Sequence, residues 1–191
     1  DMNSQALLIL TATLLLGILT TVQWRWSDHK AVFSLLAWGV FAALLVGRVV
    51  DSVRAGTART IAYTADEELP EIGADPDKFT QVVTNLVENA VTYSPEGSRV
   101  SVTATHVGED VRLTVADNGI GIPNDELDRI FERFYRVDPA RARATGGTGL
   151  GLSIVKHVAA SNGGSVEVWS EPGLGSSFTL VMPAHTQELD E

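Results

Sequence analysis

The sequence predicts an α/β protein of the α+β type, preceded by two transmembrane helices. Two uncharged apolar segments occupy most of the first 50 residues. After them, apolar residues recur with a helical period between residues 75 and 93 and again between 149 and 161. Short runs that alternate apolar and polar residues lie around these helical patterns, as expected for strands with one buried face. A chain of 191 residues has room for one such domain plus the two apolar segments.

The apolar segments cover residues 6–22 and 31–47, and neither contains a charged side chain. At about 1.5 Å per residue each spans roughly 25 Å as a helix, and flanking residues extend both toward the thickness of the hydrocarbon layer. We therefore expect residues 1–57 to form a transmembrane helical hairpin, with helices at about 6–23 and 31–50. A buried hairpin in a soluble domain is the alternative, and the apolar residues on every face of both segments disfavour it.

Positive charge predicts how the chain is oriented in the membrane. Arg48, Arg54 and Arg59 follow the second apolar segment. Because cytoplasmic flanks are enriched in Lys and Arg, these residues favour a cytoplasmic location for the C-terminal part of the chain. Arg25 and Lys30, in the short connection between the apolar segments, weaken this contrast.

The composition excludes several kinds of site. The chain has no cysteine, so it forms neither disulfides nor thiolate metal sites, and its four histidines are not spaced as metal ligands. Residues 1–60 carry five Lys or Arg and three Asp or Glu, whereas residues 61–191 carry nine and 21. Such an acidic domain is a poor candidate for binding nucleic acid, and we expect no nucleic-acid partner.

The folded domain is expected over residues 58–184, before a polar tail at 185–191. It begins with a strand-like run at 60–64 and an acidic loop. Asp75 and Pro76 then supply the N-cap and the first residue of a helix. The apolar face of this helix comprises Phe79, Val82, Val83, Leu86, Val87, Ala90 and Val91.

Polar side chains share another side of the same helix. Gln81, Asn85 and Asn89 are four residues apart, so they stack along the helix, and Glu88 and Thr92 lie beside them. A single Asn on a helix is usually solvated. Two at this spacing, beside a phosphate-binding loop, can present amide oxygens to one hydrated Mg²⁺ ion.

Two alternating runs at 100–105 and 111–115 are joined by a turn that contains Gly108. They predict an antiparallel hairpin with one buried face. The second run ends in Asp117-Asn118-Gly119-Ile120-Gly121-Ile122-Pro123. This motif is either a plain glycine-rich turn or a carboxylate at a strand end with two glycines that let a flat ring approach.

Residues 124–143 combine a short helical pattern with aromatic and basic side chains. The aromatic residues are Phe131, Phe134 and Tyr135. The basic residues Arg133, Arg136, Arg141 and Arg143 lie in a segment rich in Ala, Thr and Gly. We expect a lid whose arginines meet phosphate and whose small residues allow movement. A solvated basic loop is the alternative.

Four glycines lie in the stretch Gly146-Gly147-Thr148-Gly149-Leu150-Gly151, directly before a helix expected from Gly149 to about Ser161. The backbone N–H groups of such a loop, together with a helix N-terminus, favour anion binding. The dinucleotide-binding fingerprint is excluded because its third glycine is absent, and a P-loop because no Gly-Lys-Ser/Thr follows. Two final strands are expected around 166–168 and 178–182.

Five motifs thus occur in order along the chain. They read Asn85-Leu86-Val87-Glu88-Asn89-Ala90, Asp117-Asn118-Gly119-Ile120-Gly121-Ile122-Pro123, Phe131-Glu132-Arg133-Phe134-Tyr135-Arg136, Gly147-Thr148-Gly149-Leu150-Gly151-Leu152 and Gly173-Leu174-Gly175-Ser176-Ser177-Phe178. This order resembles the N, G1, F, G2 and G3 boxes of the catalytic and ATP-binding domain of bacterial sensor histidine kinases. The resemblance covers roughly residues 58–184. It implies a two-layer α/β sandwich of the GHKL ATPase type, a mixed sheet under three helices, as in gyrase and mismatch-repair proteins.

The resemblance also implies roles for individual residues. It places Asn85 and Asn89 at Mg²⁺ and the phosphates of ATP, as the catalytic and metal-binding pair. It gives Asp117 the hydrogen bond to the adenine amino group. The other implied ligand-binding residues are Tyr93 against adenine, Gly119 and Gly121 beside the base, Arg141 and Arg143 in the lid, and Gly147, Thr148, Gly149, Leu150 and Gly151 in the phosphate loop.

Two features depart from the family pattern. Thr92 stands where the family commonly has a basic residue, so the phosphate contact is expected to fall to Lys156 or the lid arginines. The family's phosphoacceptor histidine lies in a separate dimerisation module, typically within His-Glu-x-x-x-Pro. None of the four histidines has that context: they are His29, His106, His157 and His185.

The sequence therefore predicts a two-component sensor histidine kinase, or a shortened member of that family. The resemblance implies a multi-pass protein of the bacterial inner (cytoplasmic) membrane whose ATP domain is cytoplasmic. The protein would bind ATP with Mg²⁺ and phosphorylate a histidine in trans, on the dimerisation domain of a partner kinase or within a homodimer, and would serve a response regulator. The alternatives are a non-catalytic ATP-binding module that heterodimerises with intact kinases and a serine kinase of the anti-sigma-factor type.

Overall fold

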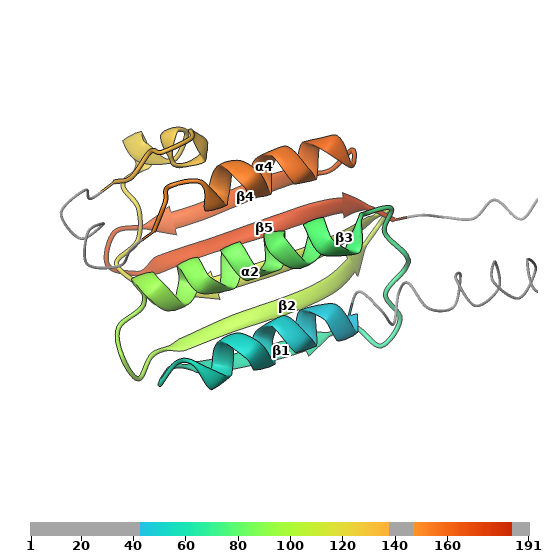
Figure 1. Ribbon diagram of the computed structural model, residues 1–191, viewed down its shortest axis with the longest axis horizontal. Helices are drawn as coiled ribbons and strands as arrows, with labels where there is room; N and C mark the ends of the chain where they lie inside the picture. The colour runs from blue at the N-terminus through green and yellow to red at the C-terminus, as the bar shows by residue number, and fades with distance from the viewer. Residues whose placement is uncertain (1–42, 138–146, 185–191) are drawn as a thin grey trace, which may run out of the picture. The chain divides into compact units, whose positions relative to one another are not determined.

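The computed structural model describes residues 43–137 and 147–184 (Figure 1). The expected membrane helix at 6–23, most of the one at 31–50, and the polar tail lie outside these ranges. Within the described ranges, no helix has the length and apolarity needed to cross a membrane.

A five-stranded mixed sheet forms one layer of the domain. Its strands are β1 (Thr60–Ala65), β2 (Arg99–Val107), β3 (Asp110–Asp117), β4 (Ser165–Glu171) and β5 (Gly175–Pro183). In space they are ordered β1-β2-β3-β5-β4. Only the β1–β2 pair is parallel, and the other three pairs are antiparallel. The hairpin predicted from the alternating runs is the β2–β3 pair, so this prediction is confirmed.

Three helical segments cover one face of the sheet within the described part of the chain (Figure 1). They are residues 43–55, α2 (Pro76–Tyr93) and α4 (Gly151–Ser161). Asp75 caps α2 as predicted, because its carboxylate accepts hydrogen bonds from the backbone N–H groups of Asp77 and Lys78 at 3.0 and 3.1 Å. The expected mixed sheet packed against helices is therefore confirmed, whereas the helical segment 43–55 lies outside the predicted domain.

The core lies between these two layers. Along β3 and β5, Val115 pairs with Phe178 and Leu113 pairs with Leu180, and all four side chains are buried under α2 and α4. The opposite face of the sheet carries small polar side chains, among them Thr114, which shares a 2.9 Å hydrogen bond with Thr179 of β5. Along the strands, side chains therefore point either into the core or to the opposite face. The residues that form a pocket lie at the strand ends and on the helices.

The structure differs from the expected domain boundary at residue 58. The side chains of Val46, Val49 and Val50 are 2%, 7% and 1% exposed and belong to the same core as the sheet. The Tyr63 hydroxyl donates to the carbonyl of residue 43 at 3.1 Å, which ties the helical segment to β1. Residues 43–50 therefore pack on the sheet, although their uncharged apolar pattern predicted a membrane helix. Valines spaced three and four apart suit a protein core as well as lipid, and the pattern alone does not separate the two.

Two smaller differences concern the ends of helices. The short helix expected after Asn124 is a pair of 3₁₀ turns, η1 (Asn124–Glu126) and η2 (Arg129–Phe131). The helix expected from Gly149 begins at Gly151, because Gly149 has φ +70°, outside the α-helical region.

Candidate functional site

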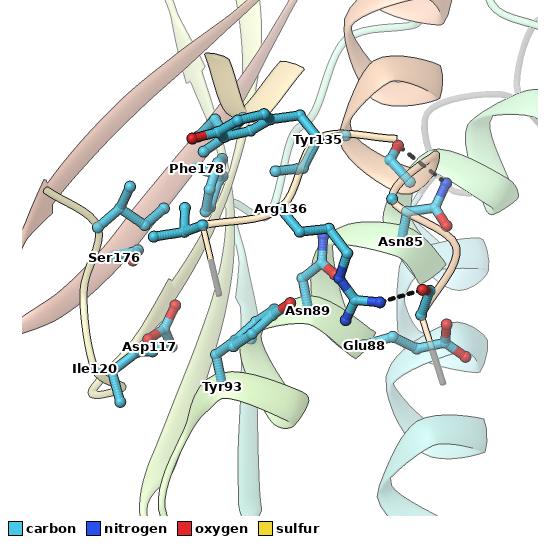
Figure 2. Close-up of a pocket in the computed structure, with 18 of the residues that line it drawn as sticks. Asn85, Glu88, Asn89, Tyr93, Asp117, Ile120, Tyr135, Arg136, Ser176 and Phe178 are labelled. Atoms are coloured by element: carbon cyan, nitrogen blue, oxygen red, sulfur yellow. Dashed lines mark hydrogen bonds between the residues drawn. The ribbon is translucent and has the colours of Figure 1, made fainter. Parts of the chain in front are cut away.

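A cavity of about 260 Å³ opens between α2, the start of α4 and the ends of β3 and β5 (Figure 2). Side chains and backbone from all five sequence motifs contribute to its wall. The lining residues are Asn85, Glu88, Asn89, Ala90, Tyr93, Asp117, Ile120, Gly121, Ile122, Ile130, Tyr135, Arg136, Val137, Gly147, Thr148, Gly149, Gly151, Leu152, Ser176 and Phe178. Figure 2 shows Asp117, Ile120 and Ser176 on one side of this space and Asn85, Glu88 and Arg136 on the other.

Helix α2 forms one wall because its polar side faces the cavity. Asn85 and Asn89 are half-buried and lie off the apolar face that packs on the sheet. The Asn85 amide donates to the Gly151 carbonyl at 3.4 Å, which joins α2 to the first residue of α4. From Asn85 to Tyr93 the helix rises about 12 Å, enough to follow a ligand lengthwise.

The described residues contain no cluster of three or more His, Cys, Asp or Glu side chains that could hold a metal ion. The oxygen donors that α2 offers at this end are the amides of Asn85 and Asn89 and the exposed carboxylate of Glu88. Because these oxygen ligands are few, they suit a Mg²⁺ ion, which would take its remaining ligands from water and phosphate oxygens.

Asp117 ends β3 at the opposite side of the cavity. One carboxylate oxygen accepts a 2.7 Å hydrogen bond from the Gly119 backbone N–H. Burial raises the pKa of Asp117 above its ordinary value, and hydrogen bonds from the backbone of Gly119 and Ser176 partly oppose this rise. The site therefore holds a partly desolvated hydrogen-bond acceptor at a fixed position, suited to an amino group on a ligand.

The glycines after Asp117 are required by the protein's own backbone. A Cβ atom on Gly119 would lie 2.6 Å from both the Asp117 carboxylate and the Tyr93 carbonyl oxygen. A Cβ on Gly121, which has φ +69°, would lie 2.0 Å from the Glu171 carbonyl oxygen. Gly121 lines the cavity, whereas Gly119 packs behind it. Packing between loops therefore requires both glycines, and their role beside a flat ring stays a prediction.

Tyr93 is the last residue of α2 and lines the cavity at the same end as Asp117 (Figure 2). Its side chain is partly exposed, at 36%. Its carbonyl oxygen is one of the two atoms that would lie 2.6 Å from a Cβ at position 119. Tyr93 and Asp117 thus line the same end of the cavity, and contact of Tyr93 with adenine stays a prediction.

The glycine loop closes the other end. Gly147, Thr148, Gly149 and Gly151 line the cavity, whereas Leu150 does not. The Gly149 carbonyl accepts a 2.9 Å hydrogen bond from the backbone N–H of Phe134, which joins the loop to the aromatic motif.

Among the described residues, Arg136 is the positively charged side chain in the cavity wall. Its guanidinium donates to the Gly147 carbonyl. The predicted lid residues Arg141 and Arg143 lie outside the described ranges, and their part in the site stays a prediction.

Several wall residues were not predicted as site residues from the sequence, notably Ile130, Ser176 and Phe178. Phe178 packs edge-on against Phe131, with ring centroids 6.5 Å apart, and so supports the aromatic motif from β5. Ser176 and Phe178 belong to the fifth motif, whose position in the site only the strand order β3-β5-β4 reveals. Lys156, suggested as a phosphate contact, does not line the cavity; its ammonium lies 5.4 Å from the centroid of the Phe131 ring.

Comparisons with known proteins agree with this geometry. Residues 74–186 match the family described as "Histidine kinase-, DNA gyrase B-, and HSP90-like ATPase". The chain is similar to "Sensor-like histidine kinase SenX3" of Mycolicibacterium smegmatis, with 53% identity over 111 residues, and this match covers 58% of the chain and 29% of SenX3.

Two solved structures are also similar. "Mycobacterial sensor histidine kinase MprB" matches with 28% identity and a TM-score of 0.63, covering 75% of this chain and 94% of that one. Full-length ShkA, whose structure is a complex with AMPPNP, matches with 28% identity and a TM-score of 0.63, covering 89% of this chain and 40% of that one.

Proposed function

Because the chain belongs to the family of histidine kinase-, DNA gyrase B- and HSP90-like ATPases, we propose that it binds Mg-ATP in this cavity and transfers the γ-phosphate to a histidine. The observation that carries the proposal is the placement of chemically different groups at the two ends of one cavity. Asp117 lies at one end, and Asn85, Asn89 and Arg136 lie at the other. ATP has matching ends, an aminopurine and a triphosphate.

The end that contains Asp117 binds adenine. The carboxylate accepts from the amino group at C6, which hypoxanthine and guanine lack at that position. Tyr93 and Ile120 supply apolar surface for the ring. Further apolar surface in the cavity wall comes from Phe178 and Ile130, which are buried.

The other end binds the triphosphate. Arg136 neutralises charge, and the backbone N–H groups of the glycine loop and of the start of α4 donate to phosphate oxygens. When bound, Mg²⁺ would be held by Asn85 and Asn89 and would supply further charge neutralisation along the phosphates. These residues orient the γ-phosphate and keep it in place.

Transfer to histidine needs little covalent work from the chain. A nitrogen of the acceptor imidazole attacks the γ-phosphorus, the bond to the β,γ-bridging oxygen breaks, and ADP leaves with that electron pair. Asn85 occupies the position where gyrase-like relatives have a glutamate that activates water. An amide cannot act as a general base, which favours transfer over hydrolysis.

The acceptor is proposed to come from another chain. His106 and His157, the two histidines in the described ranges, do not line the cavity. We extend the proposal to a membrane anchor within the uncharged apolar stretches that precede residue 43, to dimerisation and to a response regulator that receives the phosphate. The similarity to sensor histidine kinases supports dimerisation and a response regulator, and the uncharged apolar segments support the anchor. The chain spans 29% of the length of SenX3.

The test is incubation of the full chain with Mg²⁺ and γ-labelled ATP, alone and with a separately expressed kinase hairpin that carries its phosphoacceptor histidine. We expect acid-labile label on the hairpin, and loss of that label in Asn89→Ala. Gln81→Ala is the matched control, because Gln81 lies exposed on the same helix and outside the cavity wall. ATP binding without any label would contradict the kinase proposal and leave a nucleotide-binding regulatory module.

A further inference from the structure

Ser170 of β4 lies behind the adenine end of the cavity and is not part of its wall. It is buried, with 6% of its surface exposed. Its hydroxyl oxygen is within hydrogen-bond distance of three groups. They are the Ile122 backbone N–H at 2.8 Å, the Gly175 carbonyl at 2.9 Å and the Ser176 hydroxyl at 2.9 Å.

The single proton of the Ser170 hydroxyl determines how this network is arranged. The Ile122 backbone N–H can only donate and the Gly175 carbonyl can only accept. The Ser170 hydroxyl therefore accepts from the Ile122 N–H and donates to the Gly175 carbonyl. Its proton is then used. The Ser176 hydroxyl must therefore donate to Ser170, because the reverse arrangement would leave two acceptors in contact at 2.9 Å.

This arrangement directs the Ser176 hydroxyl proton away from the cavity that Ser176 lines. The Ser176 backbone N–H is also occupied, because it hydrogen-bonds to the Asp117 carboxylate. The Ser176 hydroxyl and the ionised Asp117 carboxylate can therefore only accept hydrogen bonds from a ligand at this end. The polar edge that they form consists of hydrogen-bond acceptors.

We propose that Ser170 is a positioning residue for base recognition, which holds the Ser176 hydroxyl as an acceptor and so favours a purine with an amino group at C6 over one with a carbonyl. The inference rests on the proposed binding of ATP. It adds that discrimination between adenine and a 6-oxopurine depends on a buried serine that touches no ligand. A carbonyl at C6 would face two acceptors with no proton between them, and a site built for one hydrogen-bonding pattern rejects the other strongly.

The test compares the dissociation constants of Mg-ATP and Mg-ITP for the full chain, measured by calorimetry. In Ser170→Ala the Ser176 hydroxyl loses its acceptor and can turn its proton toward the cavity. We expect the preference for ATP over ITP to fall by about 10-fold. A purely structural role would weaken both nucleotides equally and leave the ratio unchanged, and that result would overturn the proposal.

A second pair of variants shows whether Ser170 acts through Ser176. In a Ser176→Ala background, Ser170→Ala should cause no further change in the ATP:ITP ratio, because the hydroxyl to be oriented is absent. A further fall of the ratio in this background would overturn the proposal. Ser176→Ala alone should lower the preference for ATP, so the proposal can be tested even if Ser170→Ala fails to fold.

Two controls complete the design. Thr114→Val removes a partly buried hydroxyl hydrogen bond on the opposite face of the same sheet and should leave the ratio unchanged. Ser170→Thr keeps the hydroxyl and should retain the preference for ATP. If the wild-type chain bound no ATP, the proposed function would fail. If it bound ATP and Ser170→Ala kept the ratio, this inference alone would fail.

Discussion

The two ends of the cavity are built in different ways. At the adenine end, Gly119, Ser170, Gly175 and Ser176 are buried, and the groups that hold Asp117 in place are backbone N–H groups of the fold itself. At the phosphate end, the wall residues Glu88, Gly147 and Thr148 are exposed, and the described cation is an arginine on a loop. The end proposed to bind the base is therefore rigid before any ligand arrives, whereas the proposed phosphate end leaves exposed groups that ions and ligand would complete.

The largest expected difference between the two ends is in stability. Gly121→Ala places a Cβ 2.0 Å from the Glu171 carbonyl oxygen at a residue with φ +69°, so we expect the free energy of unfolding to fall by about 3 kcal/mol or more. Gly147→Ala at the phosphate end brings a Cβ 3.4 Å from the flexible end of Arg136 and should cost less than about 1 kcal/mol. Urea unfolding of both variants measures the difference. Equal losses would contradict the idea of a rigid adenine end.

The next largest effect is on base binding. Asp117→Asn removes the charge that accepts from the adenine amino group, and we expect the dissociation constant of ATP to rise by about 10- to 100-fold. Adenosine, which has no phosphates, should lose affinity by a similar factor, because the lost contact is to the base. Calorimetric titration with both ligands tests this prediction, and unchanged affinity for adenosine would contradict it.

The raised pKa of Asp117 adds a dependence on pH. Because burial raises the pKa above the ordinary 3.8, the native chain binds a proton at pH values where the unfolded chain has released it. The free energy of unfolding of the ligand-free chain should therefore decrease as pH rises from about 3.8 through the raised pKa. ATP affinity should change in the opposite direction, because the ionised carboxylate is the acceptor. Asp117→Asn should lack both components, and identical pH profiles for wild type and variant would contradict the prediction.

A smaller effect is expected at the phosphate end. Arg136→Gln removes a cation that lines the cavity, and we expect the dissociation constant of ATP to rise by about 10-fold, with no change for adenosine. The effect should shrink as salt concentration rises, because phosphate attraction at an open site is screened. Titrations at two ionic strengths measure it. A loss of adenosine affinity would show that Arg136 instead supports the adenine end.

The smallest expected effect is a gain. Thr92 is exposed and lies outside the cavity wall, one residue before Tyr93. Thr92→Lys restores the basic residue that the family pattern has there, and we expect ATP affinity to rise by about threefold, because an exposed charge contributes little. Thr92→Gln is the uncharged control. An equal gain in both variants would point to helix propensity instead of charge.

Much of the fold was predictable because its signals are local. The alternating valines of β2 and β3, the cap at Asp75 and the apolar period of α2 each follow from neighbouring residues. For the same reason Val46, Val49 and Val50 were predicted to lie in a membrane helix, whereas they pack in the core of the domain. Their spacing specifies a helix with an apolar side and does not specify whether lipid or a sheet covers that side.

From the order of the motifs alone, Asn85, Asn89, Asp117 and the glycine loop were predicted to belong to one kind of site. Each motif is a short stretch of residues with its own chemistry, so the sequence is enough to identify it. Only the tertiary structure decided which other groups complete that site. Strand β5 lies between β3 and β4, and this pairing brings Ser176 to Asp117 and Ser170 to Ile122, residues 59 and 48 positions apart in the sequence. Contacts between residues so distant depend on strand order and register, which no local pattern contains.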